Sequence, residues 1–160
     1  MPWTRPDRIN ATLAVIALFA AGVTAVPVGR DLWRNHNRPV AQITEPADGA
    51  HLAGDTTTVE GTSAHIPPDH DLWLLVRSEG HWYPVGRCAP APGGTWRFDR
   101  GRVHFGNKDE PGPYIASVYL AGPAQTGEFT AYIDKGDARG LSSLPGGITH
   151  LTTISIIRDS

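Results

Sequence analysis

Seven histidines are spread along this 160-residue chain, and neutral imidazole is a common ligand of transition metals. One short stretch holds four side chains that can bind a metal: His65, Asp69, His70 and Asp71. Pro67 and Pro68 restrict which of these side chains can converge on one point. A polar loop of this composition is ordinarily solvated, so we interpret the stretch as exposed surface and not as a metal site.

A second group of histidine and acidic residues is divided among segments 46–55, 79–81 and 106–112. If the intervening strands run antiparallel, the three segments lie at the same end of the domain, away from the N-terminus. The group consists of Asp48, His51, Asp55, Glu79, His81, Asp109 and Glu110. Its candidate metal ligands are His51, His81, Asp109 and Glu110, because carboxylates suit calcium and imidazoles suit transition metals. We favour the alternative, in which this acidic end keeps the domain soluble and monomeric.

Aromatic side chains provide a third kind of candidate site, since a flat ring can stack on the apolar face of a sugar. The candidates are Trp73, Trp82, Tyr83, Trp96 and Tyr114, and packing in a core accounts for most of them. Trp82 and Tyr83 are adjacent, so within a strand they point to opposite faces. We therefore expect one of these two rings to face solvent, which makes Trp82 and Tyr83 the candidate ligand-binding residues.

Signatures of catalysis and of cofactor binding are missing from the sequence. It contains no phosphate-binding loop, dinucleotide-binding glycine motif, zinc-protease helix motif or nucleophile elbow. Cys88 is the only cysteine, which rules out an internal disulfide, and we expect it to be a passive thiol. The net charge of −2 provides no basic surface for nucleic acid. The chain is predicted to be no enzyme, to need no cofactor and to bind no nucleic acid.

The elements that position these side chains are expected to be short strands joined by many turns, because 18 glycines and 14 prolines make up about a fifth of the chain. Apolar and β-branched runs recur between turn residues from position 39 onward, as in an antiparallel sandwich. The seven predicted strands span residues 40–44, 56–64, 72–78, 82–86, 95–105, 114–121 and 151–158, and the fifth has a predicted break near Arg100 and Gly101. The proline-rich segments 67–69, 90–94 and 111–113 are predicted to interrupt the ladders.

One helix is predicted between the sixth and seventh strands, over residues 124–135. The third strand is apolar on both alternating faces, so something must cover its outer face. Phe129, Tyr132 and Ile133 have helical spacing, and Gly136 then ends the segment. The helix is therefore expected to pack on the third strand.

Residues 9–29 are the most apolar segment, 21 residues without a charge between Arg8 and Arg30. As a helix they would be roughly 31 Å long, which matches the hydrocarbon core of a bilayer. The predicted organisation is a tail (1–8), a transmembrane helix or signal anchor (9–29), a juxtamembrane linker (30–38) and a β-sandwich domain (39–160). The lipid bilayer is thus a predicted partner, through residues 9–29.

Cleavage of a secretory signal is the alternative, since Val23, Thr24 and Ala25 resemble a cleavage site and would give a secreted domain. Basic residues flank the apolar segment on both sides, so the positive-inside rule favours the two membrane orientations almost equally. We favour a single-pass protein of the cell membrane with a cytoplasmic N-terminus and an extracytoplasmic domain.

The stretches Ile43–Ala50 and Thr58–Thr62 resemble the first two strands of bacterial immunoglobulin-like or fibronectin-III-like modules. Later segments around Trp73, Trp82, Trp96 and Tyr114 fit the same module. The resemblance implies a mainly β, seven-stranded immunoglobulin-like sandwich, although the paired cysteines of antibody domains are missing. It also implies a non-enzymatic interaction or structural module with an unidentified protein partner. Ligand sensing or carbohydrate binding is the alternative function, and a metal-dependent hydrolase ranks last.

Overall fold

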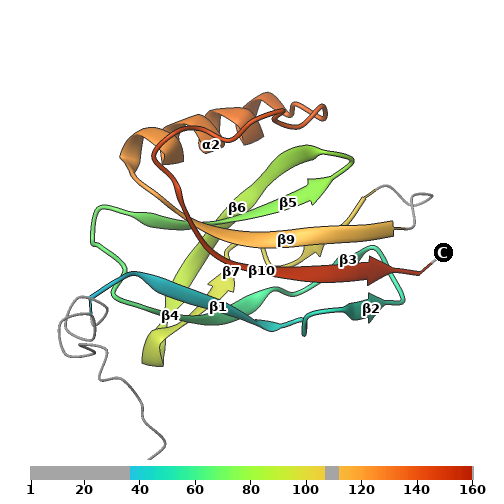
Figure 1. The fold of residues 1–160 in the computed structure, drawn as a ribbon, viewed down its shortest axis with the longest axis horizontal. Coiled ribbons are helices and arrows are strands. Elements are labelled where there is room, and N and C mark those ends of the chain that lie inside the picture. The colour runs from blue at the N-terminus through green and yellow to red at the C-terminus, as the bar shows by residue number, and fades with distance from the viewer. Residues whose placement is uncertain (1–36, 107–111, 160) are drawn as a thin grey trace, which may run out of the picture.

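The computed structural model describes residues 37–106 and 112–159, and in them the chain is mainly β with one α-helix (Figure 1). The first strands are β1 (Val40–Glu45), β2 (Ala50–Leu52), β3 (Thr56–Thr57), β4 (Glu60–Ala64) and β5 (Asp71–Ser78). They are followed by β6 (His81–Ala91), the 3-10 turn η1 (Pro92–Gly94), β7 (Thr95–Phe98) and β8 (Val103–His104). The chain ends with β9 (Gly112–Ala121), α2 (Pro123–Lys135) and β10 (Thr149–Arg158). The predicted mainly β class is confirmed.

Strand β6 joins two layers of one curled sheet. Its first half pairs with β5 and its second half pairs with β7. One layer therefore has the order β1-β4-β7-β6, and the other has the order β6-β5-β9-β10-β2. Figure 1 shows the two layers facing each other, with α2 lying across the outer side of β5, β6 and β9.

The main core lies between the two layers. Trp96 and Phe98 enter it from β7, and Leu72 and Leu74 enter it from β5. Trp96 is 1% exposed, and its indole Nε1 donates a hydrogen bond to the backbone oxygen of Thr62 at 3.0 Å. This bond satisfies the one polar atom that the ring brings into the core.

A second, smaller core lies between the sheet and α2, as the apolar third strand predicted. Trp73 and Leu75 point to this side of β5, and Phe129 of α2 meets Trp73 with ring centroids 5.2 Å apart. The helix begins with Pro123 and ends at Gly136, whose φ of 60° is left-handed and suits glycine. The predicted helix over 124–135 is confirmed, and it covers the predicted strand.

The number and direction of the strands correct the prediction of seven antiparallel strands. Residues 37–106 and 112–159 form ten strands, and β2 pairs with β10 in parallel. β2, β3 and β8 contain only three, two and two residues, too few for a period-two hydrophobic pattern to appear in the sequence.

Strand β6 continues through Pro90, where the sequence predicted an interruption. Pro90 is paired with Trp96, and among the strands of the described part of the chain β7 is the only partner of this half of β6. A proline is tolerated on an edge strand because its missing N–H is not needed on the free side. The predicted strand 82–86 is accordingly much longer in the structure.

The predicted membrane segment, 9–29, lies outside the residues that the structure describes. In residues 37–106 and 112–159, no helix is long and apolar enough to cross a membrane.

Candidate ligand-binding site

A cavity of about 600 Å³ opens where the C-terminal end of α2 meets the β5–β6 hairpin and the β7–β8 turn. Three tyrosines line it: Tyr83 of β6, Tyr114 of β9 and Tyr132 of α2. We call it the tyrosine cavity. Its apolar wall includes Pro84, Val85 and Ile133. Its polar lining includes the charged Glu79, Arg100 and Asp137, and also His104.

A β-bulge in β6 shapes the floor of the tyrosine cavity. Leu74 pairs with Gly86 and Leu75 pairs with Pro84, so Val85 is the extra, unpaired residue. A bulge of this kind increases the local twist and redirects neighbouring side chains. Side chains of paired residues lie on the same face of a sheet. Tyr83 is paired with Val76 and therefore lies on the face toward the main core, whereas Trp82 is paired with Arg77 and lies on the face toward α2.

Segment 136–141 forms the wall next to the hairpin. It runs along the free edge of β6, where the backbones of Trp82 and Leu141 exchange two hydrogen bonds of 2.9 and 2.7 Å. Gly140 has a φ of 72°, and a Cβ there would lie 2.8 Å from Cζ of Tyr83. Only glycine fits this position, so the wall can approach the Tyr83 ring closely.

The electrostatics of this wall depend on Tyr132 and Asp137. Burial raises the pKa of the Tyr132 phenol, and the Gly140 amide opposes the shift by hydrogen bonding to the phenol oxygen. Asp137 accepts hydrogen bonds from the backbone N–H and the Nε of Arg139, at 3.0 and 3.2 Å. These bonds, the backbone one first, lower the pKa of Asp137, which is therefore ionised and paired at neutral pH.

The structure places the two predicted ligand-binding residues differently. Tyr83 is half-buried and lines the tyrosine cavity. Trp82 is also half-buried, but it packs edge-on against Tyr119 at 5.8 Å, and the Arg77 guanidinium lies 5.4 Å from its ring centroid. Trp82 thus belongs to the packing beside α2, and Tyr83 is the residue that a cavity ligand can reach.

The predicted metal ligands are not brought together in the described residues. His51 of β2 pairs with Asp159 at 2.9 Å, while His81 of β6 lies 3.2 Å from the backbone oxygen of Glu79. Strands β10, β9 and β5 separate β2 from β6. Asp109 and Glu110 lie outside the described residues, within which no group of three potential ligands gathers.

The loop that holds four potential ligands contains one close pair. His70 Nδ1 lies 2.8 Å from Asp69 Oδ1, and this hydrogen bond is the main cause of the lowered pKa of Asp69. Asp71 instead accepts a hydrogen bond from Thr126 of α2 at 3.0 Å. In this structure, the end of the loop is therefore linked to α2 through the Thr126–Asp71 hydrogen bond.

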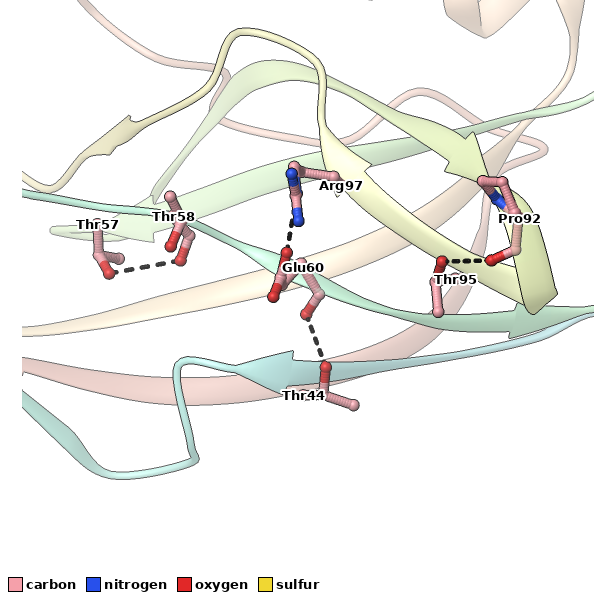
Figure 2. A network of polar contacts seen from close by, with 7 residues as sticks. All are labelled: Thr44, Thr57, Thr58, Glu60, Pro92, Thr95 and Arg97. Carbon is pink, nitrogen blue, oxygen red and sulfur yellow. Dashed lines mark hydrogen bonds and ion pairs between the residues drawn. The ribbon is translucent and has the colours of Figure 1, made fainter.

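A polar network covers the outer face of the other layer (Figure 2). Arg97 Nε donates to Glu60 Oε2 at 2.9 Å, and Thr44 Oγ1 donates to the Glu60 backbone oxygen at 3.3 Å. These contacts connect β1, β4 and β7 across a solvent-exposed surface. Exposed pairs of this kind contribute little stability, and we assign the network no binding role.

Sequence reasoning missed the contributions of Tyr132 and Arg100 to the tyrosine cavity. The sequence places Tyr132 in the helical spacing, but nothing in it indicates that this residue of α2 meets Tyr83. Arg100 lies at a predicted break in a strand, and only the pairing of β5, β6 and β7 places that break beside the hairpin.

No protein-family model matches this chain, and no curated protein matches it. Among solved structures, an engineered protein matches 77% of this chain and 20% of its own, with 17% identity and a TM-score of 0.46. The chain thus spans about a fifth of the length of that protein. Murine CRIg matches 76% of this chain and 96% of its own, with 9% identity and a TM-score of 0.34. Both TM-scores are below 0.5, so the description of the fold rests on the strand pairing in the chain itself.

Proposed function

We propose that this protein is a membrane-anchored, non-enzymatic binding module whose ligand occupies the tyrosine cavity. The observation that carries the proposal is that the half-buried rings of Tyr83 and Tyr132 line one space of about 600 Å³, whose lining also includes the core residue Tyr114, which is 3% exposed. Ligand sites are typically concave, mostly apolar and of this size, with a few polar groups that orient the ligand. Tyrosines suit such a site because each combines a flat apolar ring with a hydroxyl group.

The immunoglobulin-like assignment belongs to the same proposal. The layer orders β1-β4-β7-β6 and β6-β5-β9-β10 correspond to the ABED and CFG sheets of immunoglobulin sandwiches. Tyr114, near the start of β9, is placed like the tyrosine corner of strand F, and Ala116 stands two residues later, where antibody domains have a cysteine. One departure is that Trp73 of β5 faces α2 and not the core between the layers.

The membrane anchor rests on the composition of residues 9–29. The β5–β6 hairpin, which borders the tyrosine cavity, lies at the end of the domain opposite the start of β1 (Figure 1). In a protein anchored through residues 9–29, the cavity would therefore open away from the bilayer, where an extracytoplasmic ligand can reach it.

The first prediction concerns the residues that line the tyrosine cavity. Full-length protein in detergent micelles, screened against a library of oligosaccharides, peptides and metabolites, should bind a ligand, and Tyr83→Ala should weaken the binding at least about tenfold, because it removes a ring that contacts the ligand. The adjacent Trp82→Phe is the control, because Trp82 points to the helix face. Calorimetry on the library hit measures both affinities.

A second pair of variants keeps the test valid if Tyr83→Ala folds poorly. Ala138 is exposed and lines the cavity, so Ala138→Trp should block it from outside. Ala124 is exposed at the start of α2, and Ala124→Trp should leave binding unchanged. Binding that is indifferent to both Tyr83→Ala and Ala138→Trp would show that the tyrosine cavity is not the site.

A further inference from the structure

Three charged side chains and one histidine line the tyrosine cavity, and two of these four already have partners. Asp137 is bonded to Arg139, and His104 lies 3.9 Å from Asp55. Glu79 and Arg100 make no ion pair with any residue in 37–106 or 112–159, and they do not pair with each other. Within residues 37–106 and 112–159, one carboxylate and one guanidinium of the cavity lining therefore have no ion-pair partner, and both side chains are exposed.

Both of these charges are carried by tight turns. Glu79 and Gly80 form the two-residue turn of the β5–β6 hairpin, with φ of 50° and 82° between the paired Ser78 and His81. Positive φ at both positions is typical of a type I′ turn, whose twist matches the strands. Arg100 lies in the β7–β8 turn, which is closed by a hydrogen bond from Gly101 N to Phe98 O of 3.2 Å. The backbone positions of both charges are thus fixed before a ligand arrives.

The charges decide between classes of ligand. A neutral oligosaccharide would gain no ion pair from either Glu79 or Arg100, whose exposed charges would stay hydrated. An anion would be repelled by Glu79, and a cation would be repelled by Arg100. A zwitterion can pair with both charges at once, and Pro84, Val85 and Ile133, which line the same cavity, suit an apolar side chain.

We infer that the tyrosine cavity binds a short free peptide of two or three residues that carries an apolar or aromatic side chain. This inference rests on the proposed function. The amino terminus of the peptide meets Glu79, its carboxylate meets Arg100, and its side chain packs against the tyrosine rings. A volume of about 600 Å³ lies within the range of sites for ligands of this size.

The probe is the tripeptide Ala-Phe-Ala, titrated into the full-length protein in detergent micelles by calorimetry. Its N-acetylated form lacks the cationic end, and its C-terminal amide lacks the anionic end. Each blocked form should bind about 3- to 10-fold more weakly than the free peptide, because each loses one charge-assisted contact. Cellotriose, which is neutral, should bind more weakly than the free peptide.

Variants then assign each end of the peptide to one residue. Glu79→Gln should weaken the free peptide by about 3- to 10-fold and leave the affinity of the N-acetylated form unchanged. Arg100→Gln should likewise weaken binding of the free peptide by about 3- to 10-fold and leave the affinity of the C-terminal amide unchanged. Glu45→Gln and Arg38→Gln are the matched controls, since these exposed charges lie outside the cavity, and they should not change any affinity.

The inference fails if Ala-Phe-Ala shows no binding at millimolar concentration, if blocking either end leaves its affinity unchanged, or if the variants do not follow the ends as assigned. A different library hit that depends on Tyr83 would then leave the proposed function standing without this ligand class. If no hit depends on Tyr83 or Ala138, the proposed function and the inference fail together.

Discussion

Gly61 determines how closely β4 and β7 can pack at the scale of a single residue. A Cβ at this position would lie 2.5 Å from Cζ2 of Trp96, and it would also collide with the backbone oxygen of Gln42. The missing side chain leaves room for the indole, which is the largest group that β7 adds to the core. The requirement is steric, because neither neighbouring backbone can move without breaking its ladder.

Cys88 is a buried thiol whose ionisation the fold opposes. It is 3% exposed on β6, and burial, with a smaller contribution from Asp99, raises the pKa of the thiol. We predict that 5,5′-dithiobis(2-nitrobenzoate) will leave the native protein unmodified and will react at once with the protein in denaturant. Equal rates in the two states would contradict the burial of this thiol.

The raised pKa of Cys88 also predicts how stability depends on pH. The unfolded thiol ionises near pH 8.5, whereas the folded thiol stays neutral there. The contribution of this thiol to the free energy of unfolding is therefore complete below that pH and is lost as the pH rises. The free energy of unfolding should fall by up to about 1.4 kcal/mol per pH unit above pH 9 through this group. Urea unfolding of the parent and of Cys88→Ala at pH 7.5 and 9.5 measures this loss of stability. The same change in the free energy of unfolding between the two pH values in both proteins would refute the prediction.

Among the elements, α2 is connected to the sheet by one hydroxyl group as well as by apolar packing. Trp73 Nε1 donates to Thr126 Oγ1 at 3.1 Å, and Thr126 Oγ1 donates to Asp71 Oδ2 at 3.0 Å. The Trp73 side chain is buried, so its N–H depends on this acceptor. Thr126 thereby sets the position of the helix over β5.

We predict that Thr126→Val lowers the free energy of unfolding by about 1–3 kcal/mol, because valine keeps the shape but leaves the buried indole N–H without an acceptor. Thr130→Val is the control, since the Thr130 hydroxyl only donates to the backbone oxygen of Thr126 within the same helix. Urea unfolding curves provide the comparison. Similar losses in the two variants would mean that the contact with Trp73 is not what holds the helix.

The helix was predictable because two independent patterns agreed. Leu72 and Trp73 showed that both faces of β5 need cover, and Phe129 and Ile133 had the spacing to provide it. β2 could not be found in the same way, because three residues show no periodicity and its partner, β10, is about a hundred positions away. The bulge at Val85 was likewise invisible, since it exists only relative to β5.

For the whole molecule, the placement of the domain relative to the membrane can be tested directly. We predict that an alkaline phosphatase fusion at the C-terminus is active and that a fluorescent-protein fusion there is dark, because we place the domain outside the cell. Mass determination should show that the mature protein keeps residues 9–29. A mature N-terminus just after Ala25 would instead establish a secreted domain, and a bright fluorescent fusion would reverse the orientation.

The sequence by itself determined the mainly β class and the helix over residues 124–135, and it named Trp82 and Tyr83 together as ligand candidates without separating them. These depend on local patterns of apolar and turn residues, which indicate strands, turns and helices over a few neighbouring positions. Only the tertiary structure decided that Tyr83, Tyr132, Glu79 and Arg100 share one cavity, because they lie on four segments up to 53 positions apart. It also decided that His51 and His81 lie on strands separated by three others. Strand order and register create such neighbours, and no local pattern encodes either one.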